Sequence, residues 1–262
     1  MSEQHTPTLS DGSAGKRVIQ YDDLDGVAHA ATELFVVMAA QAQARHGVFR
    51  VALSGGSTPR RFHELLAGAP YRDQVNWARV EFYWGDERTV PPDDAESNYH
   101  MAYETLLRSL LDGGLVRPEQ IHRMQGERSD HEAAARAYED ELRKDFGLAQ
   151  GELPRFDLIY LGMGPDGHTL SLFPGTAALH VTDRLVVAND VPQQHTTRIT
   201  LTTPVANHAA LVAFLIAGAD KADALQQVLR GPYDPDRYPS QLIKPTDGEL
   251  RFLVDRAAVG QA

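Results

Sequence analysis

Short apolar runs alternate with helical patterns along most of the chain. Eight runs have the length and composition of strands: residues 18–21, 49–53, 80–84, 156–161, 185–188, 198–202, 211–216 and 250–254. Apolar residues with helical spacing predict helices at residues 24–45, 60–66, 97–111, 129–146 and 222–229. This alternation predicts an α/β fold with a mainly parallel, doubly wound sheet and helices on both of its faces.

Turn and cap residues mark the ends of these elements. Gly47 follows the first helix, Pro59 suits the first turn of the second, and Ser129 with Glu132 predicts a capping box at residue 129. Several strands run directly into polar or glycine-rich turns. Because parallel sheets bind ligands beyond the carboxyl ends of their strands, we expect these turns to form one ligand site.

Length and composition limit the class of protein. The chain has 262 residues, 42% of them hydrophobic, which is enough to bury a full core. We expect a disordered polar tail at residues 1–16 and a single α/β domain at residues 17–262. The absence of cysteine excludes disulfides and thiolate sites, and no HExxH pattern is present, so we expect neither a metal nor a cofactor.

Charge and hydropathy limit the partners. The formal net charge is −11 and there is no basic block, which argues against a nucleic-acid partner. The longest apolar run, at 209–219, is too short to cross a bilayer, and the first sixteen residues lack the apolar core of a secretory signal. We therefore expect a cytoplasmic monomer that acts on a small molecule, without a membrane partner.

The segment LGMGPDGHT at residues 161–169 carries the strongest chemical signal. Its glycine spacing from Gly162 to Gly167 matches the dinucleotide fingerprint, but that fingerprint belongs to a first βαβ unit and this one lies past the middle. The turn is therefore expected to aim a side chain and to contact substrate through Gly167. His168 can accept a proton near neutral pH and act as a general base, while Asp166 orients its ring.

A second turn predicts an anion site. Its residues place backbone amides and hydroxyl groups before a helix N-terminus, an arrangement that favours phosphate. The residues are Ser54, Gly55, Gly56, Ser57 and Thr58. The lysine of a nucleotide P-loop is missing, so a nucleotide is not the expected ligand.

Further charged residues stand where other strands begin or end. Asp86 and Arg88 follow the strand at 80–84, and the guanidinium of Arg88 suits a carboxylate, a phosphate or a developing oxyanion. Arg88 is equally compatible with a scaffold role, bound to a carboxylate. Arg198 and Lys221 are expected to be cationic partners of an anionic substrate.

In sequence order, five segments resemble 6-phosphogluconolactonases. They are SGGSTP (54–59), GDERTVPPDDAESNY (85–99), LGMGPDGHTLSLFPG (161–175), RITLT (198–202) and GADKADAL (218–225). The resemblance spans about residues 17 to 256. It implies the Rossmann-like fold shared with glucosamine-6-phosphate deaminases and ribose-5-phosphate isomerase, and hydrolysis of 6-phosphogluconolactone in the pentose phosphate pathway.

The resemblance also implies roles for the candidate residues. His168 would activate water for attack on the lactone carbonyl, and Arg88, held by Asp86, or backbone amides would stabilise the oxyanion. The 6-phosphate would bind the turn at 54–58 with Arg198 and Lys221. Whether Arg60 and Lys244 touch substrate is left open.

Two alternatives remain. A deaminase or isomerase of amino sugar phosphates would also use His168, but the catalytic glutamate of these relatives falls at Phe173 here. A non-catalytic sugar-phosphate-binding domain of a transcription regulator would share the architecture, but it would need a DNA-binding module.

Overall fold

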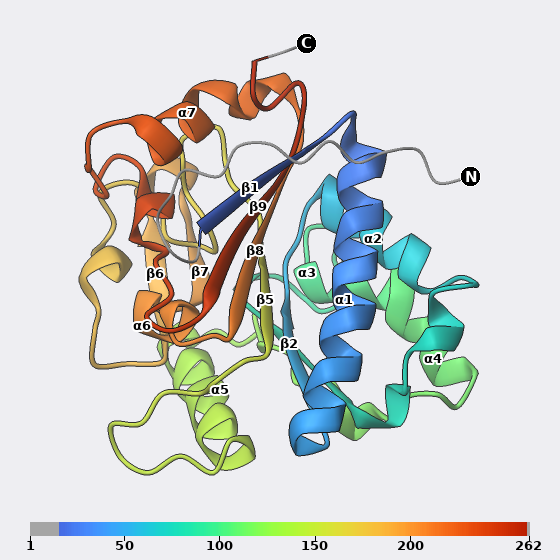
Figure 1. Ribbon diagram of the computed structural model, residues 1–262. Helices are drawn as coiled ribbons and strands as arrows, with labels where there is room; N and C mark the ends of the chain where they lie inside the picture. Colours follow the sequence, from blue (N-terminus) through green and yellow to red (C-terminus); the bar gives the residue numbers. More distant parts are fainter. Residues whose placement is uncertain (1–15, 261–262) are drawn as a thin grey trace.

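The computed structural model describes residues 16–260, and a six-stranded parallel sheet forms its centre (Figure 1). The strand order is β1-β9-β8-β5-β2-β3, with parallel pairing throughout. The bounds are β1 Lys16–Tyr21, β2 Phe49–Leu53, β3 Val80–Trp84, β5 Leu158–Leu161, β8 Leu211–Ile216 and β9 Glu249–Asp255. The predicted parallel sheet is confirmed, and β2, β3 and β8 have the predicted bounds.

Helices cover both faces of this sheet, as predicted (Figure 1). On one face lie α1 (Leu24–His46), α2 (Ser57–Leu66), and a continuous helical segment made of α3 (Asn98–Ala102), the π-helical turn Tyr103–Leu107 and α4 (Arg108–Asp112). On the other face lie α5 (His131–Asp145), α6 (Thr203–Asn207) and α7 (Ala222–Arg230).

The central strand β8 shows why these runs are apolar without interruption. Leu211, Ala213 and Leu215 belong to the core on the α1 side. Val212, Phe214 and Ile216 belong to the core on the α5 side. Successive side chains of a strand point to opposite faces, so a strand that is covered on both sides needs apolar residues at every position.

A second, three-stranded sheet packs on the α5 side of the molecule. It consists of β4 (Asp86–Arg88), β7 (Thr196–Leu201) and β6 (Val186–Val191), all antiparallel. The sequence predicts strands at 185–188 and 198–202 but does not separate them from the parallel sheet, and it places Asp86 and Arg88 after the strand at 80–84 without predicting a strand there. The short connection after Val191 makes β6 and β7 a hairpin, which requires antiparallel pairing.

The start of α5 differs from the prediction. Asp130 caps this helix by accepting a hydrogen bond from the backbone N–H of Ala133 at 2.9 Å, so the predicted capping box of Ser129 and Glu132 is wrong. The carboxylate of Glu132 instead pairs with Arg136 and Arg184. The tail predicted at residues 1–16 lies outside the described residues, except for Lys16, which begins β1. The single-domain assignment stays a prediction.

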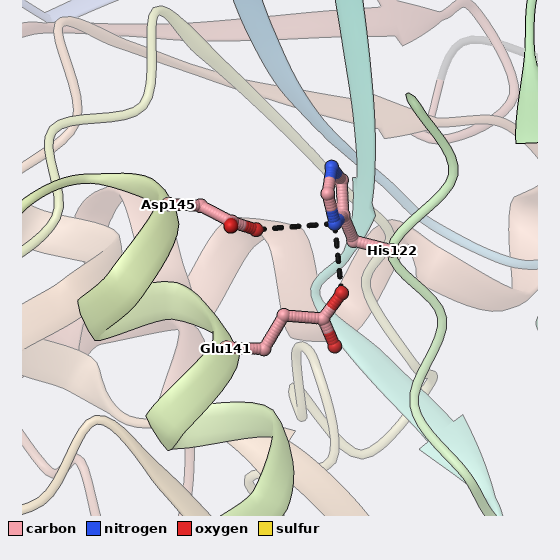
Figure 2. Close-up of side chains that lie close together, drawn as sticks. All are labelled: His122, Glu141 and Asp145. Atoms are coloured by element: carbon pink, nitrogen blue, oxygen red, sulfur yellow. Dashed lines mark hydrogen bonds and ion pairs between the residues drawn. The ribbon is translucent and has the colours of Figure 1, made fainter. Parts of the chain in front are cut away.

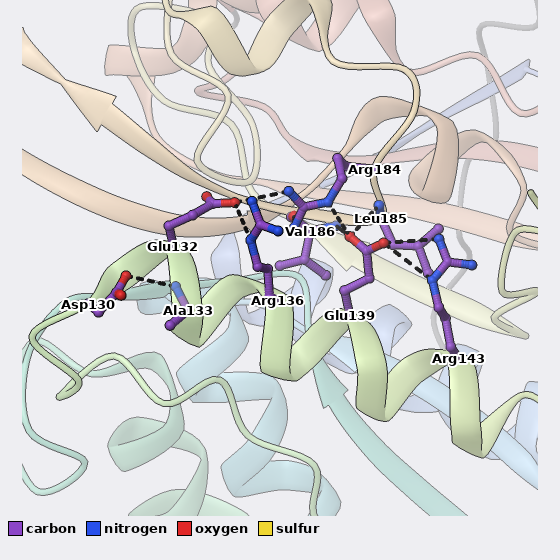
Figure 3. Close-up of polar contacts among 9 residues, drawn as sticks. All are labelled: Asp130, Glu132, Ala133, Arg136, Glu139, Arg143, Arg184, Leu185 and Val186. Carbon is purple, nitrogen blue, oxygen red and sulfur yellow. Dashed lines mark hydrogen bonds and ion pairs between the residues drawn. The ribbon is translucent and has the colours of Figure 1, made fainter. Parts of the chain in front are cut away.

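Two polar clusters join α5 to its surroundings. In the first, Glu141 and Asp145 contact His122, which lies in the segment before the helix (Figure 2). In the second, Glu139 accepts hydrogen bonds from Arg184 Nε at 2.8 Å and from Arg143 Nη2 at 2.9 Å (Figure 3). None of the helices within residues 16–260 is long and apolar enough to cross a membrane.

The second cluster has a measurable consequence for stability. Burial opposes ionisation of Glu139, but hydrogen bonds from Arg184, Arg143 and the backbone of Leu185 outweigh it and lower the pKa of Glu139. Glu139→Ala should therefore lower the free energy of unfolding by about 2 kcal/mol, somewhat less than for a fully buried pair because the two arginines are partly exposed. Urea denaturation measures this change.

The matched control is Glu132→Ala. Glu132 lies on the same helix and also pairs with Arg184, but its side chain is 45% exposed. Exposed ion pairs contribute about 0 to 1 kcal/mol, so this variant should stay close to the parent. Equal losses for the two variants would contradict the argument from burial.

Candidate active site

A cavity of about 300 Å³ lies beyond the carboxyl ends of β2, β3 and β5. Eight of the candidate residues line it: Ser54, Gly55, Gly56, Asp86, Arg88, His168, Arg198 and Lys221. They come from five separate segments of the sequence. The predicted meeting of the histidine turn and the serine-glycine turn in one cleft is therefore seen in the structure.

His168 is held in a defined orientation. Its Nδ1 lies 2.5 Å from Asp166 Oδ1, and the same oxygen accepts the backbone N–H of His168 at 3.1 Å. The ring also stacks on Phe173, with centroids 4.0 Å apart. Burial would raise the pKa of Asp166, but the hydrogen bonds from His168 lower it below its ordinary value. An ionised Asp166 fixes the proton on Nδ1, so Nε2 keeps a free lone pair for accepting a proton.

The backbone of this turn explains its glycines. Gly164 donates its N–H to the carbonyl of His168 at 2.9 Å, and a Cβ on Gly164 would lie 2.1 Å from His168 Nδ1. Gly167 has a φ of 79°, which favours glycine, and its carbonyl accepts hydrogen bonds from the N–H and hydroxyl of Ser240. Gly167 therefore anchors the turn and is not among the described residues that line the cavity.

Asp86 has partners that differ from the prediction. Its Oδ2 accepts a hydrogen bond from the hydroxyl of Ser171 at 2.6 Å, and its backbone carbonyl accepts one from Asn98 Nδ2 at 2.9 Å. Arg88 donates instead to the backbone carbonyl of Glu96. The expectation that Asp86 holds Arg88 is thus corrected: the buried Asp86 is engaged by Ser171 and Asn98, and Arg88 reaches the loop before α3.

Three cationic side chains meet at the cavity. Arg88 and Arg198 are directly opposite each other in the β4–β7 pair. Burial and then the positive charge of Arg88 lower the pKa of Arg198. Lys221 Nζ lies 2.9 Å from the exposed Asp220. Like charges placed opposite each other destabilise a sheet, so this arrangement suits a site that binds an anion.

The turn after β2 leads into the N-terminus of α2, the predicted anion site. Gly56 is the N-cap of α2, with a φ of 109° and no side-chain cap within the described residues, so the first amides of the helix are open to a ligand. A Cβ on Gly55 would lie 1.9 Å from Asn98 Oδ1, which requires glycine there. Ser57 and Thr58 lie in the first turn of α2 but are not among the described lining residues.

The cavity also contains residues that the sequence analysis did not assign. Asn98, Ser171 and Gln194 line it, and Gln194 Oε1 accepts a hydrogen bond from Arg198 at 3.0 Å. Asn98 and Ser171 lie in the segments 85–99 and 161–175 that carry the family resemblance. That resemblance was the feature of the sequence that could have identified them as site residues. Of the two residues left open, Lys244 lies over the ring of Tyr233 outside the lining, and Arg60 is likewise not among the described lining residues.

Comparison with known proteins adds an independent finding. A sequence profile of the family glucosamine-6-phosphate isomerases/6-phosphogluconolactonase matches residues 22–252, which include the whole cavity. A 6-phosphogluconolactonase from Synechocystis sp. is 42% identical over 218 residues, 83% of this chain and 86% of the relative. One from Haemophilus influenzae is 36% identical over 233 residues, 88% and 94% of the two chains. The solved 6-phosphogluconolactonase from Trypanosoma cruzi has a TM-score of 0.79 at 26% identity, covering 98% of this chain and 97% of that one.

Proposed function

Because the chain belongs to the family of glucosamine-6-phosphate isomerases and 6-phosphogluconolactonases, we propose that it hydrolyses 6-phospho-D-glucono-1,5-lactone to 6-phosphogluconate in the pentose phosphate pathway. The observation that carries this proposal is the orientation of His168. Its proton is fixed on the Asp166 side, and it lines the same cavity as three cationic residues. A base beside an anion site is what hydrolysis of a phosphorylated lactone requires.

The phosphate group binds at the cationic part of the cavity in this proposal. The open amides at the start of α2 and the side chains of Arg198 and Lys221 hold it, with Ser54 to Thr58 forming the turn. Binding the phosphate also fixes the position of the lactone carbonyl. Such positioning lowers the barrier by up to roughly 7 to 11 kcal/mol in the most favourable cases.

The chemical step then needs one base and one oxyanion site. His168 Nε2 takes a proton from water while the water oxygen attacks C1 of the lactone. Arg88 or nearby backbone amides stabilise the negative charge on the carbonyl oxygen. When the bond between C1 and the ring oxygen breaks, His168 returns the proton to that oxygen, which becomes a hydroxyl group. Asp166 keeps the imidazole oriented throughout.

Deamination or isomerisation of an amino sugar phosphate is the second candidate. Here Phe173, the position at which the family resemblance places the deaminases' glutamate, is 3% exposed and stacks on His168. A phenyl ring cannot transfer a proton, so this position favours the lactonase. Release of ammonia from glucosamine 6-phosphate would instead support the deaminase. We expect the lactonase to act as a cytoplasmic monomer, without a nucleic-acid or membrane partner.

Lys221→Ala tests the phosphate site. Loss of a charge-assisted hydrogen bond of about 1.5 to 3 kcal/mol should raise KM for the phosphorylated lactone by roughly tenfold to a hundredfold, with a smaller change in kcat. Steady-state kinetics with glucono-1,5-lactone, which has no phosphate, should show a poor substrate that is insensitive to the substitution. Lys244→Ala is the matched control, because Lys244 lies outside the cavity. Equal rates for both lactones would refute this role.

A further inference from the structure

One imidazole lies among three carboxylates at the opposite end of β3 from the cavity. His122 Nδ1 is 2.7 Å from Glu141 Oε1 and 3.1 Å from Asp145 Oδ2 (Figure 2). Its other nitrogen, Nε2, is 3.1 Å from Glu81 Oε2. Glu81 is the second residue of β3, about 13 Å along the strand direction from Gly85 at the cavity end. This cluster is therefore separate from the candidate active site.

The imidazole is held rigidly. Its ring stacks on Tyr83 with an interplanar angle of 9° and centroids 4.4 Å apart. The backbone N–H of His122 donates to the carbonyl of Phe82 at 2.9 Å, and the hydroxyl of Tyr138 contacts the carbonyl of His122 at 3.3 Å. A ring fixed at its face and at its backbone presents its two nitrogens in constant directions.

The carboxylates on the two nitrogens play different parts. Glu81 can accept the proton of Nε2, which leaves the lone pair on Nδ1. Glu141 and Asp145 are four residues apart on α5 and so lie on one face of that helix, beside Nδ1. In protein metal sites, a ligating histidine typically donates its other ring N–H to a carboxylate in this way.

A proton on Nδ1 can form a hydrogen bond with only one of the two carboxylates beside it. Nδ1 carries one hydrogen at most, and the shorter contact directs it to Glu141. Asp145 Oδ2 is buried, and apart from its 3.1 Å ion-pair contact with Nδ1 it has no hydrogen-bond partner among the described residues. The neighbouring Arg50 donates to the backbone carbonyl of Asp145 rather than to its carboxylate, and its guanidinium lies over Phe146.

We propose that His122 Nδ1, Glu141 and Asp145 bind a divalent transition-metal ion, for which Zn²⁺ is the best-suited candidate, and that Glu81 orients the imidazole. One nitrogen and two carboxylate oxygens are ligands that zinc accepts. The ligand atoms lie within 4.8 Å of one another. Tetrahedral zinc places its ligand atoms about 3.3 Å apart, so small side-chain movements complete the site. Glu141 is 40% exposed, which gives the ion and a water ligand access.

A proton competes with the metal for this histidine. Burial disfavours the charged ring, but hydrogen bonds with Glu141 and Glu81 and the charge of Asp145 raise the pKa of His122 to about 9. Zinc binding therefore displaces a proton from the ring. A cluster that holds only this proton is the alternative that the experiment must separate from a metal site.

The test is a zinc titration of the full chain after treatment with a chelator. Isothermal titration calorimetry at pH 7.5 should show one zinc ion bound at this site, with proton release that is detected by comparing two buffers. Asp145→Asn and His122→Gln should abolish this binding event, and Glu81→Gln should weaken it by about tenfold to a hundredfold. Asp140→Asn is the matched control, because Asp140 is an exposed neighbour on α5, and it should bind zinc like the parent.

Other outcomes overturn the proposal. Zinc binding that survives both Asp145→Asn and His122→Gln would belong to another site, and no binding at micromolar zinc would leave the proton as the only occupant. Anomalous diffraction from parent crystals soaked in zinc provides a second measurement, which does not depend on the folding of a variant. A zinc peak between His122, Glu141 and Asp145 supports the site, and its absence refutes it.

Discussion

Replacing His168 with alanine should lower kcat by about 10² to 10⁴ and leave KM nearly unchanged, because a general base contributes in the transition state and little to substrate binding. The structure makes this prediction specific to Nε2. Nδ1 is engaged by Asp166 at 2.5 Å, so only the other nitrogen is free to accept the proton of water. Steady-state kinetics with the phosphorylated lactone measures both constants.

His168→Asn separates the base from the scaffold around it. An asparagine amide reaches the region of Nδ1 and can still donate to Asp166, but it offers no base at the position of Nε2. We therefore expect this variant to lose as much turnover as the alanine variant. If the asparagine variant kept near-normal turnover while the alanine variant lost it, the role of residue 168 would be structural.

The sequence allowed the parallel sheet and much of the site to be predicted, for one physical reason. Strands buried on both faces are apolar at every position, so β2, β3 and β8 stand out as runs with clear ends. Polar residues directly after such runs must lie at the carboxyl edge of the sheet. This reasoning brings Ser54, Asp86 and His168 into one cavity without knowledge of the structure.

The parts that were not predicted depend on contacts between distant segments. β4 has three residues, too few for a periodic pattern, and it becomes a strand only by pairing with β7. The partner of Asp86 is Ser171, 85 residues away, which no local rule indicates. The proposed metal-binding cluster likewise unites Glu81 of β3, His122 before α5 and two carboxylates of α5, so only the pair four residues apart on α5 has a recognisable spacing in the sequence.

His63 should make the protein lose stability as the pH falls below about 6.5, the ordinary pKa of histidine. This residue lies on α2 and is fully buried. Burial, followed by the positive charge of Arg60, lowers the pKa of His63 to about 3. The hydroxyl of Thr105 donates to the backbone carbonyl of Met101 at 2.6 Å, so its oxygen accepts a hydrogen bond from His63 Nδ1. His63 Nε2 has no hydrogen-bond partner among the described residues. The folded state therefore resists protonation.

The direction of the pH effect follows from linkage. Between pH 6.5 and pH 3 the unfolded chain binds a proton at this histidine and the folded chain does not. The contribution of neutral His63 to the free energy of unfolding is therefore fully present above pH 6.5, and it falls by about 1.4 kcal/mol for each pH unit below that. His63→Leu removes this group, so its loss of unfolding free energy from pH 7 to pH 5 should be about 2 kcal/mol smaller than that of the parent. Urea denaturation at both pH values measures the difference.

His195→Asn is the control for this titration. His195 is exposed, and its φ of 51° lies in the left-handed region that asparagine adopts readily, so the substitution removes a histidine without disturbing a core. Its unfolding free energy should follow that of the parent at both pH values. If His63→Leu also followed the parent, the folded state would bind a proton at His63 as readily as the unfolded chain does, and the unpartnered Nε2 would have to find an acceptor through a rearrangement of α2.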